Sequence, residues 1–335
     1  MMHDSWFARS LKSRTGLLQW LSIAAALVFI AWILVEHADD LKTAFSLTPE
    51  LFALISVSAL ITFLMNGVEL KVLVSRFGNA VPFRDAMLLG LMTSTLNYLP
   101  LKTGTMLNGV ILRLRYKLEL THFAALVAGS TVIHLWIALV LAGGALTFEG
   151  QTKLGLLLAG APTLALLGLV IWGHRRSAGK LDAHQSRFVR AAGRAVDGMG
   201  LIFSSPRLLA IETAVNLALV MLASLRTYWS FMALSADVSM ADAIVVTSIG
   251  IVAARLSVIP GGIGFKEGGA ATGAAMAGVD PALGLAASVI DRAVTLVWLL
   301  ILGVPATIYL QRASGVSLES ASKYNAAEHA DAGDV

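Results

Sequence analysis

Long apolar runs alternate along this chain with short polar loops. Crossing the hydrocarbon core of a bilayer, roughly 30 Å thick, takes about twenty apolar residues. Runs of that length predict an all-α, polytopic membrane protein. They give six full spans, at residues 17–35, 50–68, 122–146, 154–173, 208–233 and 283–310.

Two further apolar segments, 86–112 and 243–279, are each interrupted near the middle. The interruptions read LPLKTG, from Leu99 to Gly104, and IPGGIG, from Ile259 to Gly264. Proline removes a backbone donor and disfavours helix in the residue before it, and clustered glycines weaken the following turns. Each segment is therefore predicted to form two half-helices, arranged as a re-entrant hairpin or as a pair of short spans.

The order of these segments repeats itself: span, span, broken segment, span, and then the same again. Within the last span of each half, STVIHLWIALV (Ser130 to Val140) resembles ASVIDRAVTLV (Ala287 to Val297). Three full crossings per half would place the second copy upside down, as in many alternating-access transporters. A chance likeness between two leucine-rich helices is the alternative.

This repeat predicts the organisation of the whole chain. A cytoplasmic segment would precede two membrane repeats, and a polar loop within the second repeat has the helical spacing and arginines of an interfacial helix. A plain solvated connector is the alternative for that loop, and the small, polar tail is expected to be disordered. The ranges are 1–16 for the first segment, 17–146 and 147–310 for the repeats, 174–207 for the loop and 311–335 for the tail.

Composition agrees with a membrane protein, because 57% of the residues are hydrophobic and only 14% are charged. The net charge of +4 is spread over short loops, so lipid headgroups are the expected partner and nucleic acid is not. The basic loops predict that both termini are cytoplasmic, in a bacterial inner membrane. The first span resembles a signal sequence without a small-residue cleavage site, which favours a retained anchor. With no cysteine, disulfides and thiol chemistry are excluded.

Four basic residues lie inside apolar segments of the second half, where a charge costs roughly 2.5–3.5 kcal/mol at a helix centre. Only two acidic residues of that half offset them, so an anion such as a phosphodiester headgroup would relieve the excess. These four basic and two acidic residues, together with Lys102, form the predicted headgroup-binding set. Its members are Lys102, Arg226, Arg255, Lys266, Glu267, Asp291 and Arg292.

Structural alternatives exist for most of these charges. Lys266 and Glu267 could pin the tip of a hairpin, and Arg226 could extend to the membrane surface. Asp291 and Arg292 are adjacent, hence about 100° apart on a helix, and could each hold a different helix. Glu69 and Glu212 are expected in water near the cytoplasmic interface.

The breaks themselves are candidate binding elements. The backbone donors that open the half-helix near Gly264 to Glu267 make a natural anion site, and glycine lets a headgroup approach closely. Lys102 stands at the first break. The residues predicted as hinges or backbone donors are Pro100, Gly104, Pro260, Gly261, Gly262 and Gly264.

Signatures of enzymes and ATPases do not occur in the sequence: it has no HExxH, GxSxG or Walker motif. No catalytic residue, metal or cofactor is therefore predicted. His134 has no second ligand at helical spacing, which favours a hydrogen-bonded histidine in the core. The run GGAATGAAMAG, from Gly268 to Gly278, predicts tight helix packing.

IPGGIGFKE, followed by SVIDRAVTLVWLLILG, resembles the flippase-like family named for the transmembrane region of lysylphosphatidylglycerol synthase. The resemblance covers roughly residues 17–310. Thr105 stands where that family usually has glutamate, which puts a carboxylate-dependent step there in question. The positions that match its motifs are Pro100, Lys102, Gly104, Pro260, Gly261, Gly262, Gly264, Glu267 and Arg292.

The resemblance implies movement of a lipid, or a lipid-linked headgroup, between leaflets without ATP. In fused relatives an aminoacyl-transfer domain follows the membrane region, and here only 25 residues follow the last span, so synthase activity is not expected. The alternative function is a non-transporting scaffold or accessory subunit for a lipid-modifying enzyme or glycosyltransferase. The protein partner under that alternative is a lipid-synthesis enzyme, or a second copy of this chain in a homo-oligomer.

Overall fold

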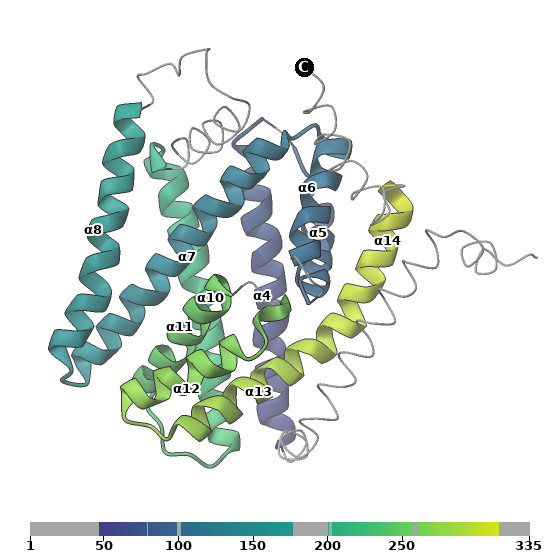
Figure 1. The fold of residues 1–335 in the computed structure, drawn as a ribbon. Helices are drawn as coiled ribbons and strands as arrows, with labels where there is room; N and C mark the ends of the chain where they lie inside the picture. The colour runs from purple at the N-terminus through teal and green to yellow at the C-terminus, as the bar shows by residue number, and fades with distance from the viewer. Residues whose placement is uncertain are drawn as a thin grey trace, which may run out of the picture.

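The structure, a computed structural model, describes residues 47–78, 80–98, 102–176, 200, 203–257 and 260–314. All regular secondary structure in these ranges is helical (Figure 1). Several predictions lie outside the described residues: the segment 1–16, the span 17–35, Pro100, most of the loop 174–207 and most of the tail.

Five helices in the described part are long and apolar enough to cross a membrane, and they match the remaining five predicted spans. Three of them begin with a capping side chain followed by proline, namely Thr48, Ser205 and Asp280. The last span is continuous but contains one π-helical turn, and it ends at Ser314 rather than at 310. The spans are α4 (Pro49–Ser75), α7 (Leu120–Phe148), α8 (Thr152–Arg176), α10 (Pro206–Ala233) and α13–η3–α14 (Pro281–Trp298, Leu299–Gly303 and Val304–Ser314).

Both interrupted segments form two helices, as predicted from their proline and glycine residues. The first gives α5 (Phe83–Leu96) and α6 (Thr103–Tyr116). The second gives α11 (Met240–Leu256), a short turn η2 (Pro260–Gly262) and α12 (Phe265–Ala277).

Small residues let α11 and α12 pack as a close antiparallel hairpin. A Cβ placed on Gly269 would lie 2.6 Å from Ala253 Cβ, and one on Gly273 would lie 2.8 Å from Val246 Cα. Any larger side chain at these glycines would separate the two helices. The tight packing predicted for the run from Gly268 to Gly278 is thus confirmed, and it occurs within the molecule.

The two hairpins enter the bundle from opposite ends. The open end of α11–α12 lies where α7 ends, because Ser239 Oγ donates to Glu149 Oε1 at 3.0 Å and Gln151 Nε2 donates to Met276 O at 2.7 Å. The open end of α5–α6 lies where α7 begins, three residues after α6 ends. Between these ends the long helix α7 runs diagonally across the bundle (Figure 1).

Helices of the first sequence half pack against helices of the second half, and the contacts are reciprocal. α4 contacts α10, α7 contacts α11, and α14 contacts α5. Two copies related by a twofold axis would produce this pattern, since α11 would correspond to α5 and α13–α14 to α7. The division into repeats at 17–146 and 147–310 stays a prediction.

Candidate functional site

The tips of the two hairpins meet in the middle of the bundle. Gly261 N–H donates to the carbonyl oxygen of Asn97 at 2.8 Å. The Tyr98 ring lies against Gly261, so closely that a Cβ there would be 2.7 Å from Tyr98 Cδ1. Two segments separated by more than 150 residues of chain therefore form one joint.

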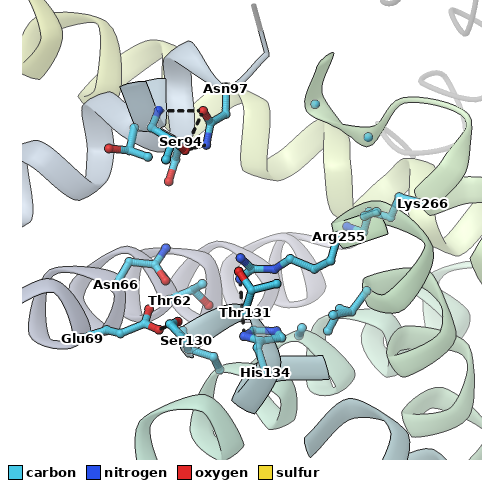
Figure 2. A pocket seen from close by; sticks show the side chains of 18 of the residues that line it. Thr62, Asn66, Glu69, Ser94, Asn97, Ser130, Thr131, His134, Arg255 and Lys266 are labelled. Carbon is cyan, nitrogen blue, oxygen red and sulfur yellow. Dashed lines mark hydrogen bonds between the residues drawn. The ribbon is translucent and has the colours of Figure 1, made fainter. Parts of the chain in front are cut away.

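A polar cavity of about 550 Å³ lies beside this joint, between the helices of both halves. Figure 2 shows α4 and α7 side chains facing those of α5 and the α11–α12 hairpin across it. Neutral hydrogen-bonding groups make up much of the wall. They include Thr62, Asn66, Thr93, Ser94, Asn97, Thr105, Asn108, Ser130, Thr131, Thr247 and Ser288.

Five of the seven predicted headgroup-binding residues line the cavity, and Glu267 and Arg292 do not. Four cations and two carboxylates face it, so the wall carries two more positive than negative charges. The charges are those of Lys102, Arg226, Arg255, Lys266, Glu69 and Asp291.

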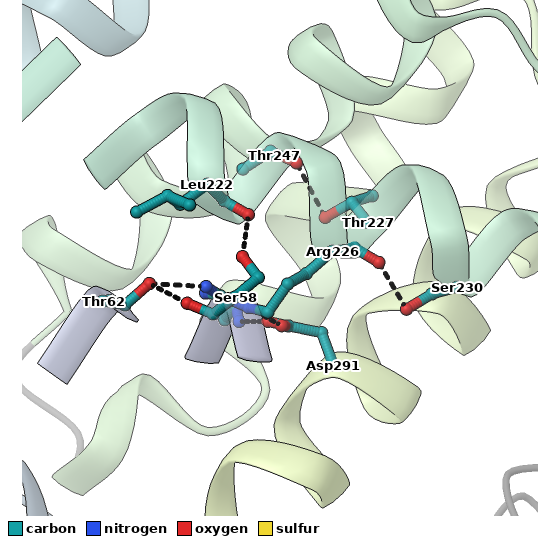
Figure 3. A network of polar contacts seen from close by, with 9 residues as sticks. Ser58, Thr62, Leu222, Arg226, Thr227, Ser230, Thr247 and Asp291 are labelled. Carbon is teal, nitrogen blue, oxygen red and sulfur yellow. Dashed lines mark hydrogen bonds and ion pairs between the residues drawn. The ribbon is translucent and has the colours of Figure 1, made fainter. Parts of the chain in front are cut away.

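Two of the cations share one carboxylate. Arg226 Nε lies 2.5 Å from Asp291 Oδ1, and Lys266 Nζ lies 2.7 Å from Asp291 Oδ2. Arg226 also donates from Nη1 to Thr62 Oγ1 at 2.7 Å (Figure 3). Arg226 is only 6% exposed, so the expectation that it could extend to the membrane surface is wrong: α10 directs it into the bundle, where Asp291 compensates its charge.

A third ion pair fixes the start of α12. Arg292 Nη2 lies 2.7 Å from Glu267 Oε1, and Glu267 Oε2 accepts the N–H of Gly264 at 2.8 Å. The backbone N–H of Gly264, predicted to be available to a ligand, thus donates to the side chain of Glu267 instead. Asp291 and Arg292 contact different residues, but they do not hold different helices as predicted. Both reach α12, Asp291 at Lys266 and Arg292 at Glu267, because these two partners are also adjacent.

Arg255 differs from Arg226, Lys266 and Arg292, the other three cations within apolar segments of the second half. Among the described residues it has no carboxylate within 4 Å, and its Nη2 lies 3.4 Å from His134 Nδ1. Its side chain is exposed to the cavity, where Figure 2 shows it extended toward Thr131 and His134. The predicted surplus of uncompensated cations is therefore smaller than expected, and Arg255 is its clearest member.

His134 is a hydrogen-bonded core histidine, as predicted. It is 6% exposed, and its Nδ1 lies 2.7 Å from Asn216 Oδ1. Within the described residues, no group of three His, Cys, Asp or Glu side chains could hold a metal ion.

Glu212 is not in water, contrary to expectation. It is fully buried; its Oε2 lies 3.4 Å from Asn216 Nδ2, and its Oε1 has no partner among the described residues. Glu69 faces the cavity, where its Oε1 accepts the Ser130 hydroxyl at 2.5 Å. Hydropathy places both near a membrane surface, but α4, α7 and α10 converge there and cover them.

The hinge residues occupy different surroundings. Gly261 and Gly262 line the cavity with φ of 62° each, a conformation that side chains disfavour. Gly264 has φ of 76° and caps α12. Gly104 lies in the first turn of α6, buried against Thr93 rather than in the break, and Pro260 begins η2.

Several wall residues were missed, although the sequence carries a signal for them. Thr62, Asn66 and Glu69 recur at i, i+4 and i+7 in α4, which is a polar stripe on one face of an apolar helix. Ser130 and His134 are spaced in the same way in α7. A search for polar stripes within apolar runs, in addition to charges, would have found them.

Opposed broken hairpins around a polar cavity define a class of polytopic helical membrane protein. Within it, this chain belongs to the family described as Lysylphosphatidylglycerol synthase TM region, whose model matches residues 19–303. Comparisons with curated proteins and with solved structures gave no significant match.

Proposed function

We propose that this protein moves an anionic lipid, or a lipid-linked anionic headgroup, between the leaflets of the membrane without hydrolysing ATP. The observation that carries the proposal is a 550 Å³ polar cavity among membrane-spanning helices, with an excess of cations in its wall. Such a cavity replaces the hydration that a headgroup loses on leaving the membrane surface. Membership of a family of membrane regions linked to lipid modification supports it.

In this proposal Arg255 and Lys102 bind the headgroup, because both face the cavity and neither has a carboxylate partner among the described residues. Arginine grips a phosphodiester through two parallel hydrogen bonds. Arg226, Lys266 and Asp291 form part of the cavity wall. Because the two cations are paired with Asp291, they attract the headgroup electrostatically and do not bind it directly. Glu267 and Arg292 hold the hairpin tip in place.

We further propose that the hairpins are re-entrant and dip from opposite leaflets of a bacterial inner membrane. Basic residues concentrate at one end of the bundle, where α5 begins, α6 ends and α10 begins. That end would face the cytoplasm under the positive-inside rule. Its described basic residues are Arg76, Arg84, Arg113, Arg115, Lys117 and Arg207.

A scaffold for another enzyme is less well supported. That alternative depended on small-residue faces for a partner. Gly269 and Gly273 pack on α11 within the same chain, so this face is already used.

Lipid movement can be measured in proteoliposomes that contain fluorescent phosphatidylglycerol, by chemical quenching of the outer leaflet. Arg255→Ala should slow translocation about tenfold or more, since a charged hydrogen bond contributes roughly 1.5–3 kcal/mol. Arg255→Lys should retain part of the rate. The matched control is Lys153→Ala, an exposed cation at the start of α8 outside the cavity. Rates that equal those of protein-free vesicles would contradict the proposed function, and an unaffected Arg255→Ala would contradict the role of Arg255.

A further inference from the structure

A second cavity, of about 370 Å³, lies between α6 and α7 next to the polar one. Its own walls are almost entirely apolar: Met106, Gly109 and Val110 of α6, and Leu120, Ala124 and Ala128 of α7. Three further residues, Thr105, Phe123 and Val127, line both cavities. The apolar groove therefore adjoins the polar cavity across these three residues.

We propose that this groove holds an acyl chain of the lipid whose headgroup occupies the polar cavity, an inference that rests on the proposed function. A lipid has one polar and one apolar end. The larger cavity offers hydroxyl, amide and charged groups to the headgroup, whereas the groove offers almost only hydrocarbon. Adjoining polar and apolar compartments accommodate both ends at once. The acyl chain then stays in contact with the bilayer while the headgroup is inside.

The groove exists because a ring, rather than backbone, separates the two helices. A Cβ on Gly109 would lie 2.7 Å from Phe123 Cδ1, so the Phe123 ring fills the space that a side chain at position 109 would need. Met106 and Ala124 are exposed on either side of it. Phe123 thus forms the partition between the hydrocarbon groove and the polar cavity.

The corresponding helices of the second half are closed. Under the predicted repeat, α12–α13 corresponds to α6–α7, and there a Cβ on Gly284 would lie 2.7 Å from the backbone oxygen of Ala270. Helices that approach to backbone contact leave no room for an acyl chain. Of these two pairs of helices, α6–α7 is therefore open and α12–α13 is closed.

The position of the groove also gives its direction. α6 runs from the joint of the two hairpins toward the basic end of the bundle, and the groove follows α6 from Thr105 to Val110. In this conformation the acyl chain therefore extends toward the leaflet at the basic end. Closure of α6–α7 with opening of α12–α13 would present the same cavity to the opposite leaflet.

The test uses phosphatidylglycerol with a photoactivatable diazirine in its acyl chain, mixed with the full chain in proteoliposomes and mapped by mass spectrometry. Labelling of 105–110 and 120–128 should exceed labelling of the outward face of α8 several-fold. Ala124→Trp, which fills the groove from an exposed position, should remove that excess and slow translocation. Ala165→Trp, exposed on α8, is the control. Ala124→Leu repeats the test with a smaller side chain if the tryptophan variant does not fold.

Equal labelling of the groove and of α8, or an excess that survives both substitutions at Ala124, would overturn the acyl-chain site even if the wild-type protein translocates lipid. Labelling that is enriched in the groove and lost in Ala124→Trp would support the site even if no translocation is measured. In that case the proposed function fails separately from the site.

Discussion

At the scale of single residues, the most consequential side chain is Asp291. Its two carboxylate oxygens are each bonded to a different cation, Arg226 of α10 and Lys266 of α12, and it is 3% exposed. One acidic side chain therefore ties three helices together. Removing one partner of a buried ion pair leaves an uncompensated charge in a medium that solvates it poorly.

Asp291→Asn should lower the stability of the protein by about 3–5 kcal/mol, because Arg226 stays buried without a counter-charge. The measurement is the unfolding midpoint of the purified protein in detergent. Arg226→Met combined with Asp291→Leu should recover much of the loss, since the apolar pair needs no compensation. A single variant as stable as the wild type would show that water or lipid compensates Arg226 instead.

The sequence predicts these charges better than their partners. The intramembrane positions of Arg226, Lys266 and Asp291 follow from hydropathy. Helical geometry predicts that Asp291 and Arg292 take different partners, but not that both partners lie on α12. Which helices become neighbours decides the pairing. Asp291 pairs with two cations, while Arg255 has no carboxylate partner among the described residues. Glu212 illustrates the same limit, because only the convergence of α4, α7 and α10 shows that it is buried.

At the scale of elements, the joint between the hairpins depends on a glycine. Gly261 has φ of 62° and lies under the Tyr98 ring, so it meets a conformational and a steric requirement at once. Proline and glycine identify the breaks from sequence alone. Which atoms of the two breaks touch is set by packing over a separation of more than 150 residues and could not be predicted.

Gly261→Ala should weaken the joint, because the new Cβ collides with Tyr98 and the left-handed conformation costs about 1–2 kcal/mol. Hydrogen exchange at the amide of residue 261 should become faster than in the wild type. Gly278→Ala is the matched control, since Gly278 has φ of 78° but no atom within 4 Å of the added Cβ. If Gly278→Ala accelerates hydrogen exchange at the amide of residue 261 as much as Gly261→Ala does, backbone strain alone explains the faster exchange. The contact with Tyr98 then contributes nothing.

At the scale of the whole molecule, the two ends of the bundle differ in charge. Basic residues gather where α6 ends and α7 begins, whereas the described residues of the opposite end include Glu50, Glu149, Asp237 and Asp280. Glu149 lies at this acidic end, where burial and the nearby Asp242 raise its pKa, while a hydrogen bond from Ser239 opposes the shift. Hydropathy and charge predicted this polarity of the bundle, but the cavity at its centre is formed by helices of both halves and is not visible in any single segment.

The absence of cysteine from the chain makes its orientation directly measurable. A single cysteine at Asp237, exposed at the acidic end, should react with a membrane-impermeant maleimide in intact cells. One at Glu119, exposed at the basic end, should react only after the membrane is opened. The reverse pattern would place the basic end outside and invert the proposed direction of lipid entry.

The bond between Gly261 and Asn97 joins a main-chain amide to a main-chain carbonyl, and this has an evolutionary implication. The side chain at position 97 takes no part in the bond itself, while position 261 has room only for hydrogen. The hydrogen bond at the joint therefore does not involve the side chains that line the cavity. Related proteins could therefore differ in the residues that line the cavity and still keep the joint between the hairpins.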